Sequence, residues 1–225
     1  MQENREFMEN NKVEISGIIA SQLSYDHTML GEKFYKTSVI VIRDSGVTDS
    51  IPIMVTDRMP EINEFYVGKK VRLYGQFRSY NKMVEEKARL ILYMFPNKIV
   101  FPEDDVSNVN NICLRGFICK APNYRQTPLG REVCDIRMAV NRAYKRTDYI
   151  PCIAWGRNAR YASKLEVGTE IEICGRIQSR DYYKKLDDET SVCRRAYEVS
   201  IWKIEIVSKN SCMEEGALEA LNKTL

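Results

Sequence analysis

The sequence is poor in the residues that most metal and catalytic sites use. It contains one histidine, His27, and no pair among its seven cysteines has the C-x-x-C spacing. A zinc site takes several cysteine or histidine ligands, and His27 has no catalytic partner in view. We therefore expect no metal, no cofactor and no catalytic residue. Most cysteines fall inside apolar strand patterns, where we expect reduced thiols that behave as small apolar side chains.

Long apolar runs are also absent. No run approaches the roughly 18 residues that a membrane-spanning helix needs. The first residues, MQENREFMENNK, are polar and lack the apolar centre of a secretory signal. With 44% hydrophobic and 29% charged residues, the composition is typical of a globular protein. We expect a cytoplasmic protein without a membrane partner.

The net charge of +3 is small, but it is distributed unevenly along the chain. Residues 1–109 contain 14 Lys and Arg against 16 Asp and Glu, whereas residues 110–207 contain 18 against 12. The positive excess of the second half predicts a polyanionic partner for that half.

An internal repeat divides the chain into two related halves. A shift of 99 positions places Gly17, Tyr25, Arg43 and Asp49 on Gly116, Tyr124, Arg142 and Asp148, and a shift of 100 places Gly75 and Ser79 on Gly175 and Ser179. Such a repeat predicts two related domains. We expect a flexible N-terminus at 1–10, a first domain at 11–101, a linker at 102–110, a second domain at 111–207 and a tail at 208–225.

Both halves alternate apolar with other residues in the period of a β-strand. In the second half the strands cover approximately 112–118, 134–140, 150–154, 171–177 and 197–201, with one helical segment near 156–165. Five short strands with a helix between the third and fourth are typical of a Greek-key barrel of the OB type. The sequence predicts an all-β fold with two tandem OB domains and one short helix in each.

The third strand of the second half is apolar on both faces. Ile150, Cys152 and Ala154 alternate with an outer set made of Tyr149, Pro151, Ile153 and Trp155. An apolar outer face indicates that a ligand, a subunit or another element covers it.

Aromatic and basic residues gather around this outer face. Neighbouring hairpins add Tyr144, Tyr182 and Tyr183. Single-stranded nucleic acid is bound by rings that stack on bases and by cations that neutralise phosphates. The predicted binding residues are Tyr144, Tyr149, Trp155, Tyr182, Arg142, Lys145, Arg146, Arg157, Arg176, Arg180 and Lys184.

One long stretch carries a family resemblance. The segments NICLRGFI, TPLGREV and AVNRAYKRTDYIPCIAWGRNARYASKLEVGTEIEICGRIQSRDYYKK, followed by YEV, resemble the bacterial single-stranded DNA-binding protein family over nearly all of 110–207. The resemblance implies binding of single-stranded DNA in replication, recombination or repair, near the nucleoid. It also implies that the family's stacking rings fall on Tyr144, Tyr149, Trp155 and Tyr182, and that phosphate contacts fall on basic residues such as Arg142, Arg157 and Arg180.

The first half departs from this pattern. Its positions equivalent to the four rings are Ser45, Ser50, Thr56 and Lys82. We therefore expect a degenerate OB domain that serves assembly, extends the groove weakly or binds a protein partner.

The end of the chain and the number of domains also differ from the usual family member. The chain ends in SKNSCMEEGALEALNKTL, so the family's acidic, apolar recruitment tip is absent. Two domains per chain would reach the four barrels of a typical family assembly as a homodimer, which we expect here.

Two other functions remain open at this point. An OB protein could use its covered apolar face to join a protein complex in replication or plasmid maintenance. An OB-barrel nuclease would need acidic residues around a metal, for which Asp135, Asp148 and Glu198 are available without an evident carboxylate pair. RNA is an alternative ligand, because stacking grooves accept either nucleic acid.

Overall fold

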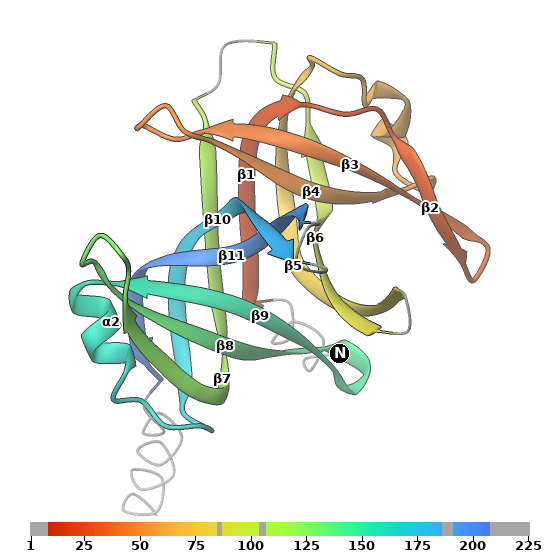
Figure 1. The fold of residues 1–225 in the computed structure, drawn as a ribbon. Coiled ribbons are helices and arrows are strands. Elements are labelled where there is room, and N and C mark those ends of the chain that lie inside the picture. The colour runs from red at the N-terminus through yellow and green to blue at the C-terminus, as the bar shows by residue number, and fades with distance from the viewer. Residues whose placement is uncertain (1–8, 85–86, 104–106, 186–190, 208–225) are drawn as a thin grey trace, which may run out of the picture.

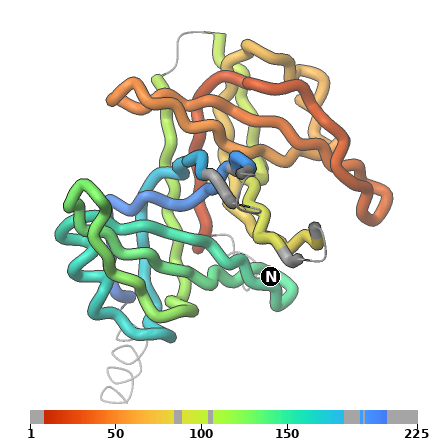
Figure 2. The backbone as a smooth tube through the Cα atoms, viewed as in Figure 1, coloured from red at the N-terminus to blue at the C-terminus, as the bar shows by residue number. Residues whose placement is uncertain are grey.

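The structure is a computed structural model that describes residues 9–84, 87–103, 107–185 and 191–207. The first half contains β1 (Asn11–Ile19), β2 (Ser24–Met29), β3 (Glu32–Ile42), β4 (Thr48–Thr56), the 3-10 helix η1 (Pro60–Glu64), β5 (Lys70–Val84) and β6 (Lys87–Val100). The second half contains β7 (Val109–Gln126), β8 (Glu132–Arg142), the 3-10 turn η2 (Ala143–Lys145), β9 (Arg146–Trp155), α2 (Arg157–Ala162), β10 (Glu170–Lys185) and β11 (Ser191–Ile206). Figure 1 shows these strands as two barrels, with the first above the second in this view, and Figure 2 traces the chain from one barrel to the other.

Each half closes into a barrel with the same strand order. In the first barrel β1 pairs with β5 and β3, β5 pairs with β6, and β6 runs parallel to β4, which pairs with β3. In the second barrel β7 pairs with β10 and β8, β10 pairs with β11, and β11 runs parallel to β9, which pairs with β8. The predicted pair of five-stranded OB barrels is confirmed.

The two barrels share one continuous sheet. Strand β1 runs antiparallel to β7, with Asn11 opposite Leu114 and Ser16 opposite Val109. The same two strands also belong to their own barrels, so backbone hydrogen bonds connect the halves directly. The barrels are therefore held together by more than the segment between β6 and β7.

The inward positions of the second barrel agree with the period-two prediction. Ile150, Cys152 and Ala154 are buried, as are the inward residues of β7, β8 and β10. Gly116 and Gly175 allow close strand approaches, because a Cβ at either position would overlap a backbone carbonyl of the facing strand, and Gly17 and Gly75 do the same in the first barrel. The glycines of the first and fourth strands of each copy therefore serve barrel closure.

Two expectations about the helices and the outer face of β9 need refinement. The helix of the first barrel is a 3-10 helix of five residues, whereas the second barrel has the α-helix α2. The outer face of β9 is partly closed, because Ile153 is buried beside β11.

The expectation that the cysteines are reduced is wrong for one pair. Cys113 and Cys174 face each other across β7 and β10 and form a disulfide. Cys134 and Cys152 are free and buried, as expected of small apolar residues. Burial raises the pKa of the Cys134 thiol to about 11, so this thiol stays protonated at neutral pH.

Among the residues that the structure describes, no helix has the length and apolar character needed to cross a membrane.

Candidate nucleic-acid interface

The junction between the barrels is built from residues that match across the repeat. The backbone N–H of Ser179 donates to Oδ1 of Asp49 at 2.9 Å, and the backbone N–H of Ser79 donates to Oδ1 of Asp148 at 2.6 Å. The hydroxyl groups complete the pattern: Ser179 accepts from the N–H of Ser50, and Ser79 accepts from the N–H of Tyr149. The two halves thus exchange equivalent hydrogen bonds through an approximate twofold arrangement.

Each buried junction carboxylate also has an arginine partner from its own barrel. Arg43 donates to both oxygens of Asp49 at 2.6 Å, which raises the pKa of the Arg43 guanidinium. Nε of Arg142 lies 3.2 Å from Oδ2 of Asp148. Burial raises the pKa of the Asp148 carboxyl, while the Ser79 hydrogen bond and the positive charge of Arg142 oppose that rise. The sequence predicts Arg142 as a phosphate contact, and here Asp148 already balances its charge.

The predicted rings lie along β9 and the hairpins beside it. Tyr149 is at the junction end of β9 and Trp155 is at the other end, six residues along an extended strand and so about 20 Å apart. Both rings are partly exposed, at 44% and 36%. Tyr182, on β10, is 38% exposed.

Tyr144 is the most exposed of the four predicted rings, at 91%. It lies in the turn between β8 and β9, where Tyr144 and Lys145 both have positive φ, at 61° and 55°. Non-glycine residues rarely adopt this conformation, so the turn holds the ring outward at a small cost in backbone energy. Arg146 follows at the start of β9 and is exposed.

A groove of about 490 Å³ lies where β10 and β11 meet the first barrel. We call it the interbarrel groove and define it by Trp155, Trp202, Arg131, Arg176, Arg180 and Arg43. Trp155 is fixed by a hydrogen bond from its indole Nε1 to Oγ of Ser200, at 3.1 Å. An adjoining cavity shares Ser179 and Arg180 with this groove and continues along β4.

The structure brings three of the predicted residues together in this groove: Trp155, Arg176 and Arg180. Trp202, Arg131 and Arg43 are additions that the sequence reasoning missed. Nε of Arg180 lies 3.5 Å from Oε1 of Glu198, with more than half of the arginine side chain exposed. Arg157 and Lys145 are exposed on the same barrel outside the groove. The side chain of Lys184 lies outside the described residues.

The first barrel lacks the equivalent platform. Ser50 is used at the junction and Thr56 is buried. Two pairs of its rings pack on each other: His27 stacks on Phe34 with centroids 4.6 Å apart, and Tyr80 stacks on Tyr93 at 6.0 Å, whereas Tyr25 and Tyr66 are exposed. The degenerate role expected for this barrel stays a prediction.

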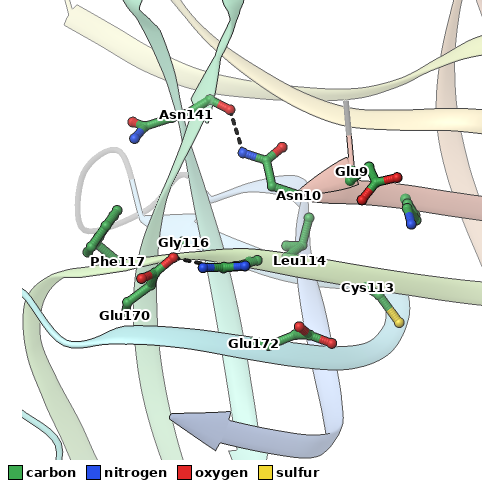
Figure 3. Close-up of a pocket in the computed structure, with 11 residues that line it drawn as sticks. Glu9, Asn10, Cys113, Leu114, Gly116, Phe117, Asn141, Glu170 and Glu172 are labelled. Carbon is green, nitrogen blue, oxygen red and sulfur yellow. Dashed lines mark hydrogen bonds and ion pairs between the residues drawn. The ribbon is translucent and has the colours of Figure 1, made fainter. Parts of the chain in front are cut away.

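A second cavity of about 500 Å³ has the wrong charge for a polyanion. It lies between the start of β1 and the strands β7 and β10, and Figure 3 shows its lining. Its charged lining has three carboxylates, Glu9, Glu170 and Glu172, against two cations, Lys12 and Arg115, and Glu170 pairs with Arg115 at 2.8 Å. Carboxylates repel phosphate, so the interbarrel groove is the better candidate for a nucleic acid.

The acidic residues considered for a nuclease have separate partners. Asp135 pairs with Arg125, Asp148 belongs to the junction, and Glu198 accepts from Gln178. In the described part of the chain, no group of three or more His, Cys, Asp or Glu side chains is placed to hold a metal ion. The C-terminal residues 208–225, where the recruitment tip was expected to be absent, lie outside the described residues.

Known proteins show the same domain and the same architecture. Residues 109–207 match the model of the single-strand binding protein family. The chain is 35% identical over 81 residues to single-stranded DNA-binding protein 2 of Listeria innocua, a match that covers 33% of this chain and 51% of that protein. Single-stranded DNA-binding protein A of Bacillus subtilis is also 35% identical over 81 residues, covering 33% of this chain and 47% of that protein. The chain thus spans about half the length of these relatives.

A solved structure extends the likeness to both barrels. The crystal structure of the wild-type single-stranded DNA-binding protein from Thermus aquaticus superposes with a TM-score of 0.69 at 20% identity. It covers 92% of this chain and 97% of that chain, so it shows that the tandem-barrel fold is shared. Residues 109–207, which form the second barrel, thus match the single-strand binding protein family.

Proposed function

We propose that this protein binds single-stranded DNA with little sequence preference and protects it during replication, recombination or repair. The observation that carries the proposal is the interbarrel groove, where Trp155 lies with Arg176 and Arg180. Stacking on a ring is worth about 1–3 kcal/mol per base and tolerates any base, because every base has a π-face. The matches to single-stranded DNA-binding proteins support the same ligand for the second barrel. The role is binding rather than catalysis.

The exposed rings outside the groove support a long contact path. Tyr144, Tyr149 and Tyr182 each present an accessible ring on the second barrel. Lys145, Arg146 and Arg157 add exposed cations on the same barrel. If six cations met phosphates, the logarithm of the binding constant would fall with the logarithm of salt concentration at a slope of about −4, from roughly −0.7 per contact on single strands.

A double substitution tests the stacking platform. In the full chain, Trp155→Ala with Tyr182→Ala should weaken binding of a labelled dT oligomer by about fivefold to several hundredfold, measured by fluorescence anisotropy at fixed salt. Tyr161→Ala is a matched control, because Tyr161 is 40% exposed on α2 of the same barrel and does not line the groove. Unchanged affinity in a folded double variant would reject the proposal. An oligo(U) of equal length, titrated in parallel, decides between DNA and RNA.

A homodimer is part of the proposal, since two chains would bring four barrels together. Light scattering at micromolar concentration should give about twice the chain mass of 26.2 kDa. A mass equal to one chain would refute the dimer.

A further inference from the structure

The interbarrel groove combines side chains from both barrels. The second barrel supplies both tryptophans of the protein, Trp155 and Trp202, together with Arg131, Arg176 and Arg180. The first barrel supplies Arg43 and Val47, from the end of β3 and the turn that leads into β4. None of the described residues that line this groove is acidic.

The charges at the floor of the groove are not fully balanced. Asp49, which is buried and paired with Arg43, also exerts its negative charge on Arg176. Burial lowers the pKa of Arg176, and the positive charge of Arg43 lowers it further. Among the described residues, the buried Nε of Arg176 has no hydrogen-bond partner. Two guanidinium groups that share one carboxylate leave a place where a phosphate would be stabilised.

Trp202 reaches the groove because of a β-bulge. Cys174 pairs with Lys203 and Gly175 pairs with Ile201, so Trp202 is the extra residue on β11. Its side chain is 51% exposed, and its carbonyl accepts a hydrogen bond from Asn158 of α2 at 3.0 Å. A bulge redirects a side chain relative to the regular alternation, and here it leaves an aromatic ring beside the groove.

The equivalent positions of the first barrel have none of these groups. Thr56 stands where the second barrel has Trp155, and Glu32 stands where it has Arg131. The first barrel has the same bulge, between Tyr74 and Gly75, and its extra residue is Asn97. The first barrel has the same fold without these side chains, so the barrel architecture does not require them. Their presence on one side only points to a ligand.

We propose that single-stranded DNA passes through the interbarrel groove, with Trp202 as a second stacking surface and Arg176 and Arg131 as phosphate contacts. The turn of the first barrel that contains Val47 forms the opposite wall. The first barrel then takes a direct part in binding instead of serving assembly alone. This inference rests on the proposed function and assigns its path across the two barrels.

A single-tryptophan variant tests the contact with Trp202. Trp155→Phe keeps an aromatic ring for stacking and leaves Trp202 as the only tryptophan. Titration of the full chain with a dT oligomer should quench the remaining emission, while anisotropy of a labelled oligomer records binding in the same samples. Binding without any change in Trp202 emission would overturn the inference. Trp202→Ala should weaken binding by about fivefold or more.

A pair of charge substitutions tests the wall from the first barrel. Val47→Asp places a carboxylate beside the bound phosphates and should weaken binding by about threefold to tenfold at low salt, with a smaller effect at high salt. Val67→Asp is the matched control, because Val67 is equally exposed, at 51%, on the first barrel and does not line the groove. Equal affinities for the two variants would overturn a role for the first barrel.

The outcomes separate this inference from the proposed function. If the wild-type chain binds dT oligomers and the Trp155→Ala, Tyr182→Ala variant binds weakly, the proposed function holds. If Trp202→Ala and Val47→Asp then bind the dT oligomer as tightly as the wild type, only the path through the interbarrel groove is overturned. A wild-type chain that fails to bind overturns both.

Discussion

The reciprocal junction predicts a large cost for removing one of its carboxylates. In Asp148→Ala, Ser79 loses the acceptor of its 2.6 Å hydrogen bond and Arg142 loses its counter-ion at 3.2 Å. Asp148 is fully buried, whereas the side chain of Arg142 keeps 24% exposure. Breaking a buried charge pair costs about 3–5 kcal/mol, and the partial exposure of the arginine favours the lower end, about 3 kcal/mol. For a chain of this length that corresponds to a fall in Tm of about 6–12 °C.

Differential scanning calorimetry at neutral pH measures this effect directly. Asp49→Ala should show a fall of similar size, because the two halves make equivalent contacts. Asp44→Ala is the control, since Asp44 is exposed in the turn between β3 and β4 and its removal should change Tm by about 1 °C or less. A Tm for Asp148→Ala within about 2 °C of the wild type would refute the view that these carboxylates hold the barrels together.

Three further predictions concern the barrels themselves. Gly175→Ala should lower the free energy of unfolding by about 1–3 kcal/mol, because the added Cβ meets a backbone carbonyl of β11; an unchanged Tm would show that the strands can separate there. Cys113→Ser with Cys174→Ser should lower Tm in oxidising buffer and abolish its response to reductant, since the disulfide closes a segment with a sequence separation of 61 and is worth about 4 kcal/mol. Although burial raises the pKa of the Asp26 carboxyl, a histidine hydrogen bond and two lysines lower it below its ordinary value of 3.8. Asp26→Asn should therefore cost stability above pH 3.8, and the difference in Tm from the wild type should shrink as pH falls below it; a constant difference would contradict this linkage.

The local pattern of the sequence was enough to predict the barrels. Strand alternation separated Ile150, Cys152 and Ala154 from the outer face of β9, and all three are buried. The repeat placed the two glycines of each barrel at equivalent positions, where the structure brings two strands into close contact. These features depend on residues that are near each other in sequence or on the shift of the repeat, so no tertiary information was needed.

The junction could not be predicted, because it depends on contacts between distant residues. Ser79 and Asp148 are 69 positions apart, and neither has a local feature that indicates the other. The sequence did contain a signal, since Arg43, Asp49 and Ser79 recur as Arg142, Asp148 and Ser179. Core packing requires none of these polar residues, so their recurrence in both copies indicated a shared polar contact. Arg142 was instead interpreted only as a phosphate contact.

Strand register explains why the disulfide and the position of Trp202 could not be predicted from the sequence. Cys113 and Cys174 each alternate with buried neighbours, but only the pairing of β7 with β10 places them opposite each other. Trp202 follows the inward Ile201 and belongs to a bulge that alternation cannot predict. The strand alternation alone therefore gives no signal that Trp202 lines the groove together with Trp155.

The two copies differ in their residues at the groove but agree at the junction, because only the junction is built from reciprocal contacts. At the approximate twofold junction each carboxylate serves the other barrel, so a change in one copy leaves a buried group of its partner unpaired. The hydrogen bond of Trp155 differs from those of the junction, because its indole donates to Ser200 of its own barrel. One copy could therefore replace its ring by Thr56 and its cation by Glu32 without loss of the fold. The reciprocal buried contacts keep the junction the same in both copies, whereas the groove can carry its ring and its cation on the second barrel alone.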